Sequence, residues 1–263
     1  MRPSRIKAKL GRGEPALVTT IHAADPSFHE MASLMGFDGI WLDLEHHPVS
    51  LETAAGLMRA ARVGAADTLV RPAKGEFMRM GRILEAGAQG IMYPRCADAA
   101  EAREVVKWAK FAPLGRRGVD SANADAPYCL MPLEKYVREA NEQTFLVVQL
   151  EDPESVANAR EIAEVEGVDV LLFGPGDFSV IAGFPGQFQH PVIEEAIRTV
   201  AAAARAARKH WGIPVGTPER ARQMLDLGAR FLAYGADILW VQQGLAEARR
   251  RFEPLGFTFD GQF

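Results

Sequence analysis

Two apolar runs with one helical segment between them constrain the fold of this 263-residue chain most strongly. They occupy residues 145–150 and 168–173. Near-continuous apolar runs of this length are typical of strands that are buried on both faces, as in a parallel sheet. Pro153 suits the first turn of a helix, so the unit is predicted to be strand, helix, strand, with both strands running in the same direction.

An acidic residue follows each of these two strands. Glu151 comes directly after the first, and Asp177 follows the second after Gly174-Pro175-Gly176. Since ligands bind at the C-terminal edge of parallel strands, the two carboxylates are candidates for holding a hard divalent cation through oxygen. The alternative is that both acids only cap the helices that follow them.

Six further strand candidates alternate with helical segments along the chain. These strands are expected at residues 16–21, 39–44, 68–71, 90–93, 212–216 and 231–234. Helices are expected at residues 26–35, 51–63, 77–86, 98–110, 132–141, 191–209, 218–227 and 238–251, with an irregular loop at residues 111–131. This alternation predicts an α/β protein with one (β/α)8 TIM barrel over residues 1–263. A doubly wound sheet is the alternative, but the first strand is not followed by a glycine-rich fingerprint.

Composition and charge argue against several classes of partner. The net charge of −4 gives no reason to expect nucleic acid. The basic N-terminus has no apolar core behind it, and no apolar run is long enough to span a bilayer, so neither a secretory signal nor a membrane partner is expected. Cys96 and Cys129 form no zinc spacing and imply no disulfide framework, so the expected location is a reducing cytoplasm.

The second predicted strand ends in two carboxylates and two histidines, Asp43, Glu45, His46 and His47. In a barrel the catalytic groups are expected at the C-terminal ends of the strands. Histidine is the natural base near neutral pH, which makes His46 and His47 candidates for moving a proton. The alternative for either histidine is a solvated turn.

Other strand ends carry groups that suit an anionic substrate. Arg71 closes the third strand, and its guanidinium can fork onto a carboxylate or an enolate oxygen, although a surface ion pair is the alternative. Gln149 and Glu151 have the same parity on the fifth strand, so their side chains are expected to face the same side. The glycines after the sixth strand let the backbone approach a ligand closely, and successive N–H groups there suit a carboxylate.

Three other kinds of chemistry lack their sequence signals. The chain contains neither a Walker-type phosphate loop nor a Gly-x-Ser-x-Gly elbow. The sixth strand carries no lysine for a Schiff base. Lys74, just past Arg71, is the one lysine near a predicted rim, and covalent catalysis by it is the alternative to a metal-dependent reaction.

Four motifs occur in the order in which one enzyme family carries them. They are Asp43-Leu44-Glu45-His46, Val70-Arg71-Pro72, Val148-Gln149-Leu150-Glu151 and Phe173-Gly174-Pro175-Gly176-Asp177-Phe178-Ser179. Together they resemble the HpcH/HpaI family of metal-dependent pyruvate aldolases, which includes 4-hydroxy-2-oxoheptanedioate and 2-dehydro-3-deoxyglucarate aldolases. The likeness covers nearly the whole chain.

The resemblance implies a class II aldolase that reversibly cleaves a 4-hydroxy-2-oxo acid to pyruvate and an aldehyde through a metal-bound pyruvate enolate. It implies that Glu151 and Asp177 hold Mg²⁺ or Mn²⁺, with Co²⁺ as another candidate, and that Gln149 supports the site. The backbone amides of Gly176 and Asp177 are expected to hold the pyruvate carboxylate.

The same resemblance assigns the groups that handle charge and protons. Arg71 is implied to stabilise the enolate, and His46 to act as the base with help from Asp43. Glu85 falls where the family places an acid that orients this histidine. The family is usually hexameric, with active sites near subunit contacts, so a homo-hexamer is expected.

The C-terminal region is more apolar than a terminal helix normally leaves exposed. The residues concerned are Leu239, Trp240, Val241, Leu245, Phe252, Leu255, Phe257 and Phe259. We expect this region to make contacts between subunits. The alternative is that these side chains pack inside their own subunit.

Some positions depart from the family pattern and leave the aldehyde open. Thr20 stands where some members have tryptophan, Gly176 replaces a common alanine, and residues 93–96 replace a more apolar rim. Residues 73–80 and 93–96 are also similar to macrophomate synthase, which decarboxylates oxaloacetate and couples the enolate to another molecule. An oxaloacetate decarboxylase of that kind is therefore the main alternative function. A CoA-ester lyase and a keto-acid sensor without turnover are further alternatives.

Overall fold

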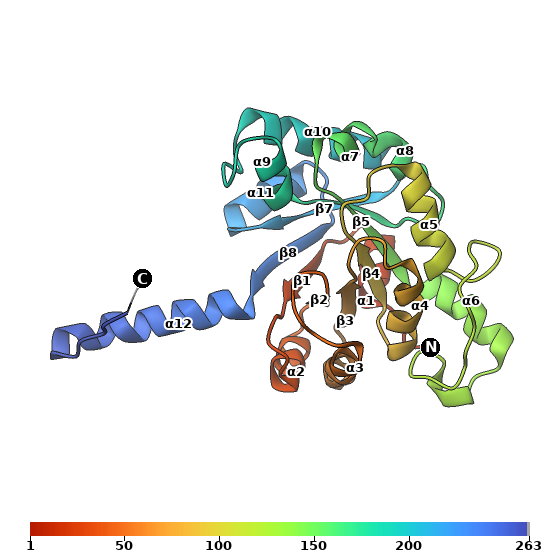
Figure 1. The fold of residues 1–263 in the computed structure, drawn as a ribbon, viewed down its shortest axis with the longest axis horizontal. Coiled ribbons are helices and arrows are strands. Elements are labelled where there is room, and N and C mark those ends of the chain that lie inside the picture. The colour runs from red at the N-terminus through yellow and green to blue at the C-terminus, as the bar shows by residue number, and fades with distance from the viewer. Residues whose placement is uncertain (262–263) are drawn as a thin grey trace.

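The computed structural model describes residues 1–261 and contains a closed barrel of eight parallel strands in sequence order (Figure 1). The strands are β1 (Ala16–Thr20), β2 (Gly39–Asp43), β3 (Asp67–Arg71), β4 (Gly90–Tyr93), β5 (Phe145–Leu150), β6 (Val170–Phe173), β7 (His210–Val215) and β8 (Phe231–Ala236). Strand β8 closes the barrel by pairing with β1. The prediction of a (β/α)8 TIM barrel is confirmed, and the doubly wound alternative is wrong.

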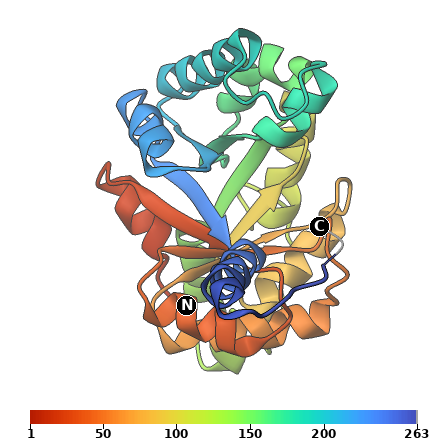
Figure 2. The same ribbon diagram turned by 90° about the vertical axis from the view of Figure 1, so that its left-hand side faces the viewer.

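The helices surround the sheet (Figure 2). They are α1 (Arg5–Gly11), α2 (Pro26–Leu34), α3 (Leu51–Ala60), α4 (Phe77–Ala86), α5 (Ala99–Ala109), α6 (Leu133–Gln143), α7 (Pro153–Ala157), α8 (Ala159–Ala163), α9 (Pro175–Ile181), α10 (Pro191–Ala206), α11 (Pro218–Asp226) and α12 (Asp237–Phe252). Asp25, Ser50 and Asp98 begin their helices by accepting a hydrogen bond from an N–H of the first turn. Helices α1 and α9 were not predicted, because each is only two turns long and lacks an extended apolar pattern.

The alternation of side chains along the strands fills the interior of the barrel. Residues two apart on a strand face the same side. Trp41, Leu69 and Val147 belong to one buried apolar cluster, which also contains Ile6 and Leu10 of α1. Helix α1 therefore covers the N-terminal end of the barrel, and the positions two residues beyond Trp41, Leu69 and Val147 lie at the open C-terminal end.

The predicted irregular loop at residues 111–131 is confirmed, apart from one 3-10 turn at Pro127–Cys129. A buried ion pair anchors it, since Arg117 Nη2 lies 2.9 Å from Asp125 Oδ2. Tyr136 of α6 donates a hydrogen bond of 2.8 Å to the same carboxylate oxygen. This network holds the loop against the outside of the barrel.

Helix α12 projects from the barrel as an arm (Figures 1 and 2). Of its residues only Asp237 is buried. Leu245 is 67% exposed, and Ile238, Val241 and Phe252 are also exposed. The alternative that this apolar region packs inside its own subunit is therefore wrong for the described chain.

None of the helices in the described part of the chain is both long enough and apolar enough to cross a membrane.

Candidate active site

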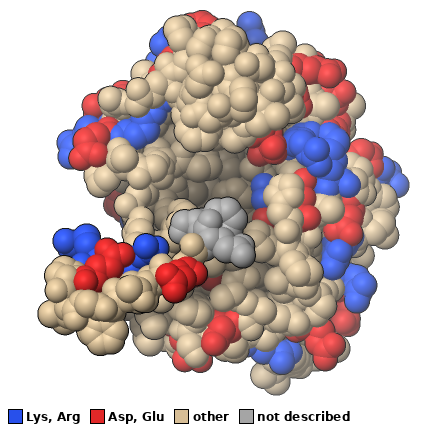
Figure 3. Space-filling view, turned by 60° about the vertical axis from the view of Figure 1, so that its left-hand side comes forward, with Lys and Arg blue, Asp and Glu red and all other residues tan. Residues whose placement is uncertain are grey.

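A cavity of about 620 Å³ opens at the C-terminal ends of the strands. Figure 3 shows the hollow on this side of the molecule. Its lining comes partly from β2, β3, β5 and β6 and the turn after β6, with Trp41, Arg71, Gln149, Glu151, Gly174, Gly176 and Asp177. The rest, which we call the distal wall, comes from the segment before α10 and from β7 and α11, with Phe188, Gln189, Ile213, Pro214, Val215, Thr217 and Arg220. Candidate residues from the ends of β3, β5 and β6 thus meet in one cavity.

Strand parity explains why polar groups gather here. Asp43, Arg71 and Gln149 each lie two positions after a residue of the interior cluster, so their side chains also face inward. These three residues lie at the C-terminal end of the barrel interior, beyond the buried apolar cluster and away from α1. The sequence prediction that Gln149 and Glu151 face the same side agrees with a hydrogen bond of 2.8 Å from Gln149 Nε2 to Glu151 Oε1.

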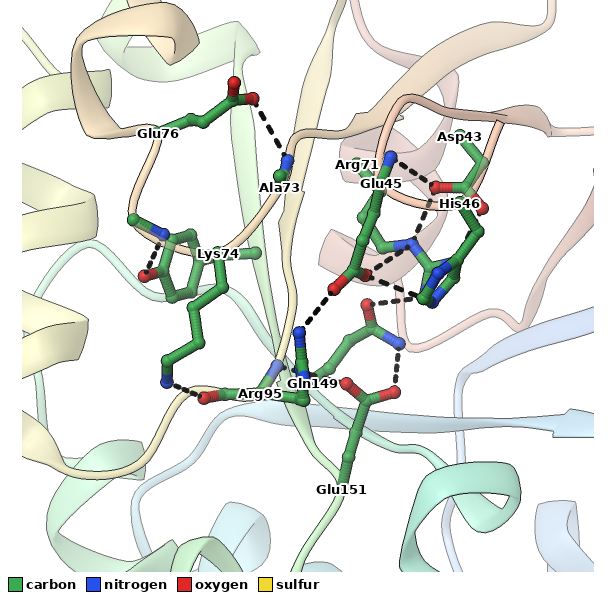
Figure 4. Close-up of polar contacts among 12 residues, drawn as sticks. Asp43, Glu45, His46, Arg71, Ala73, Lys74, Glu76, Arg95, Gln149 and Glu151 are labelled. Atoms are coloured by element: carbon green, nitrogen blue, oxygen red, sulfur yellow. Dashed lines mark hydrogen bonds and ion pairs between the residues drawn. The ribbon is translucent and has the colours of Figure 1, made fainter. Parts of the chain in front are cut away.

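Asp43 holds Arg71 through two parallel hydrogen bonds (Figure 4). Arg71 Nε donates to Oδ1 at 2.9 Å, and Nη2 donates to Oδ2 at 2.6 Å. Burial by itself would raise the pKa of Asp43, but the hydrogen bonds and charge of Arg71 lower it to about 2. The guanidinium also lies over the Trp41 ring, 4.8 Å from its centroid. Arg71 is therefore a rigid, buried positive charge at the wall of the cavity.

Glu151 is a buried carboxylate whose hydrogen-bond donors are both uncharged. One donor is the Gln149 amide, and the other is the backbone N–H of Arg95, 3.0 Å from Oε2. Burial raises the pKa of Glu151 to about 7, and the charge of Arg71 only partly opposes this. A side chain at position 174 would collide with this carboxylate, since a Cβ on Gly174 would overlap Glu151 Oε1.

These residues fit a divalent cation that has ligands besides the protein. Asp177 lines the same cavity as Glu151, and its charge adds to the raised pKa of Glu151. A cation between the two carboxylates would supply the charge compensation that Glu151 lacks. Within residues 1–261, no three His, Cys, Asp or Glu side chains form a complete metal cluster. The remaining coordination positions are therefore left to water or substrate oxygens.

The histidines at the end of β2 are arranged differently from the prediction. Asp43 was expected to assist His46, but its Oδ2 lies 3.3 Å from Nδ1 of His47. The His47 ring stacks on His22, with centroids 4.2 Å apart. His46 is 55% exposed, and its Nε2 lies 3.6 Å from Glu45 Oε2. In this structure the turn after β2 directs His47 to Asp43, and the assistance of His46 by Asp43 stays a prediction.

Glu85 is not brought to His46 within this chain. It lies on the outer helix α4, where burial raises its pKa. The charge of Arg117 in the long loop lowers this pKa, and the charges of Asp120 and Asp125 raise it. The predicted orienting contact is therefore absent among the described residues of one subunit. The sequence position alone did not reveal that α4 turns this side chain towards the loop.

Lys74 is placed away from covalent chemistry. Its Nζ lies 2.9 Å from Glu101 Oε2 and also donates to the Arg95 carbonyl. An ammonium group held by a carboxylate is a poor nucleophile, and the cavity wall described above does not include this residue.

Two further charged residues belong to the site and were not assigned a role from the sequence. The Glu45 side chain is only 6% exposed, and it lies 3.3 Å from Arg71 Nε and 3.1 Å from Arg95 Nη2 (Figure 4). Glu45 was visible in the motif after β2, but its partners come from β3 and the loop after β4. Arg220 of α11 carried no signal, because its place at the cavity follows only from the packing of the helices.

The fold and site define a TIM-barrel protein with an arginine-backed acidic cavity at the C-terminal ends of its strands. The HpcH/HpaI aldolase/citrate lyase family model matches residues 18–243, and the chain belongs to this family. The predicted resemblance is thereby confirmed.

Known relatives cover nearly the whole chain. It is 36% identical to a hydroxypyruvate/pyruvate aldolase of Pseudomonas aeruginosa, over 95% of this chain and 93% of that protein. It is 32% identical to a 4-hydroxy-2-oxo-heptane-1,7-dioate aldolase of Salmonella arizonae, over 94% and 93% respectively. A crystal structure of an HpcH/HpaI aldolase from Desulfitobacterium hafniense superimposes with a TM-score of 0.89, at 27% identity and 94% and 96% coverage. The likeness to macrophomate synthase is also confirmed, with a TM-score of 0.80 at 25% identity over 96% of this chain and 90% of that one.

Proposed function

We propose that the protein is a class II aldolase that reversibly cleaves a 4-hydroxy-2-oxo acid to pyruvate and an aldehyde. The observation that carries the proposal is the arrangement of Arg71 and Glu151 in one cavity. Arg71 is a clamped positive charge, whereas Glu151 is a buried carboxylate that has no ion-pair partner among residues 1–261. The names of the aldolase relatives support the same class of reaction.

The residues divide the work of the reaction between charge and proton transfer. A divalent ion on Glu151 and Asp177 would act as a Lewis acid towards the 2-keto oxygen. Arg71 presents preorganised positive charge where the enolate oxygen develops negative charge. The amides of Gly176 and Asp177 are the proposed site of the pyruvate carboxylate, and Gly176 leaves room for it, since a Cβ there would meet nothing within 4 Å.

Proton transfer is assigned to His46. In cleavage it takes the proton of the 4-hydroxyl group while the bond between C3 and C4 breaks and the aldehyde forms. The electron pair of that bond remains on the pyruvate fragment as its enolate, next to Arg71. In synthesis the same base removes a proton from the pyruvate methyl group.

Decarboxylation of oxaloacetate is the second candidate. It is supported by the likeness to macrophomate synthase, and it needs the same charge stabilisation because loss of CO2 also produces the pyruvate enolate. A CoA-ester lyase has no such support from a described residue.

Removal of divalent metal should abolish cleavage, and Mg²⁺ or Mn²⁺ should restore it. Because burial raises the pKa of Glu151 to about 7, a proton on this carboxylate competes with the cation below that pH. Above pH 7 the carboxylate is ionised, and burial of its charge destabilises the folded protein. A bound cation should therefore stabilise the protein more above pH 7 than below it. We expect the metal-induced rise in Tm, measured by scanning fluorimetry, to be larger at pH 8 than at pH 6.

Glu151→Gln should lose the metal-induced rise in Tm at both pH values. Glu154→Gln on the exposed face of α7 makes the same charge change away from the cavity and should keep it. Full turnover in the presence of a chelator, or a borohydride-trapped pyruvate adduct on Lys74, would show that the reaction does not depend on metal.

We further propose a homo-oligomer, with a hexamer as the expected size, assembled through α12. The support is the apolar arm, because a helix that exposes Leu239, Val241 and Leu245 to water is unfavourable in an isolated subunit. Light scattering at micromolar concentration should give the mass of an assembly. Leu245→Glu should reduce that mass, whereas Gln243→Glu, an exposed polar position on the same helix, should not. A wild-type monomer would contradict the proposal.

A further inference from the structure

The distal wall of the cavity that also holds the candidate metal carboxylates carries one arginine, Arg220, in the first turn of α11. Its Nη2 lies 2.5 Å from Oε1 of Glu194 on α10, and its Nη1 donates to Gln223 at 3.0 Å. The Arg220 and Glu194 side chains are only 19% and 24% exposed. An ion pair that is mostly shielded from water is little weakened by salt, so Glu194 neutralises Arg220 where it faces the cavity.

The charge of the cavity follows from these pairs. Among the described residues that line it, the cations are Arg71 and Arg220. Arg71 is clamped by Asp43, and Arg220 is paired with Glu194. The rest of the distal wall is neutral or apolar, with Phe188, Gln189, Ile213, Pro214, Val215 and Thr217.

If an acceptor aldehyde carried a carboxylate at its far end, that group would lose its hydration at this wall and would find no unpaired cation there. An uncharged aldehyde of the same length has no such cost, and it gains apolar contact with Phe188 and Pro214. The two kinds of acceptor therefore differ in the charge at the end away from the aldehyde group. Glu194 determines whether the distal wall offers the charge of Arg220 to that end.

We propose that the distal wall selects uncharged short aldehydes as acceptors, and that Glu194 is a specificity-determining residue because it masks the charge of Arg220. This inference rests on the proposed aldolase function and names the class of aldehyde that the same site takes. Removal of the Glu194 charge releases a guanidinium towards the cavity, where it can fork onto the carboxylate of an anionic acceptor.

Two aldehydes of equal length test the proposal. Butanal and succinic semialdehyde both have four carbons, and the second carries a carboxylate where the first has a methyl group. The kcat/KM of pyruvate addition is measured for each with the Mg²⁺-loaded protein. We expect the wild type to prefer butanal by about tenfold or more, because a charged group pays the larger desolvation cost. Glu194→Gln should raise kcat/KM for succinic semialdehyde about tenfold and change that for butanal by less than about twofold.

Two further variants separate charge masking from a general effect of mutation. Glu194→Gln combined with Arg220→Gln should lose the gain for succinic semialdehyde, since the released cation is gone. Glu195→Gln removes a neighbouring charge on α10 that pairs with Arg198 on the surface, and it should leave both acceptors unchanged. A wild type that prefers succinic semialdehyde, or an equal change of both acceptors in Glu194→Gln, would overturn the inference.

The exchange of the pyruvate methyl protons for deuterium, followed by NMR, distinguishes the two levels of failure. Metal-dependent exchange together with the opposite acceptor preference overturns the acceptor inference and leaves the aldolase proposal standing. If neither exchange nor addition occurs with either aldehyde, the aldolase proposal fails and the acceptor inference fails with it.

Discussion

Replacement of His46 by alanine should separate aldol cleavage from oxaloacetate decarboxylation. Cleavage needs a base for the 4-hydroxyl proton, and loss of a general base typically costs about 10²–10⁴-fold in the step that uses it. Decarboxylation forms the enolate by loss of CO2 and needs no such base. The His46→Ala protein should therefore lose cleavage by roughly that factor and keep decarboxylation within about tenfold.

The paired measurement is kcat/KM on oxaloacetate and on one accepted aldol, for His46→Ala and for His47→Ala. The structure makes the comparison sharp, because Asp43 contacts His47 and not His46. An unchanged cleavage rate in His46→Ala, together with a large loss in His47→Ala, would move the base to the histidine that Asp43 holds. Equal losses of both reactions in His46→Ala would mean that this residue organises the site and does not move the proton.

Replacement of Arg71 by alanine should damage cleavage and decarboxylation together. Both reactions place negative charge on the enolate oxygen, and removal of one preorganised donor at such a position costs about 10²–10³-fold in kcat. The loss also leaves Asp43 buried without its cation, so the pKa of Asp43 should rise from its value of about 2. We expect a lower Tm as well as the lower kcat.

Arg71→Lys tests whether charge alone suffices, since lysine cannot make the two parallel hydrogen bonds to Asp43. Arg79→Ala on α4 is the matched control, because Arg79 pairs with Glu76 on the partly exposed face of that helix. It should leave both reactions unchanged. A loss in Arg71→Ala that is confined to one of the two reactions would contradict a shared role in holding the enolate charge.

Much of the barrel was predictable because its signals are local. The apolar runs at residues 145–150 and 168–173 contain β5 and β6, and the glycine after α4 takes the left-handed conformation that ends the helix. The position of a carboxylate just after a strand can also be read from the sequence. Glu151 and Asp177 were therefore expected at the same edge of the sheet, and both line the cavity. The short helices α1 and α9 escaped prediction because two turns contain too few residues to show a period.

The contacts within the site were less predictable, because each depends on a partner that is distant along the chain. Arg71 reaches Asp43 across 28 residues and Gln149 across 78. The direction of α4 places Glu85 near Arg117 of the long loop, and the turn after β2 decides which histidine meets Asp43. The spacing of residues in the sequence does not determine any of these contacts.

The sequence by itself determined which side chains face inward at the strand ends, because the two-residue period of a strand fixes the side on which Asp43, Arg71 and Gln149 project. Only the tertiary structure decided which charges neutralise one another. Closure of the barrel sets Arg71 against Asp43 and leaves Glu151 with no ion-pair partner in the described part of the chain, and the packing of α10 on α11 sets Glu194 against Arg220. Ion pairing depends on distance in space, and that distance exists only once the strands and helices have packed.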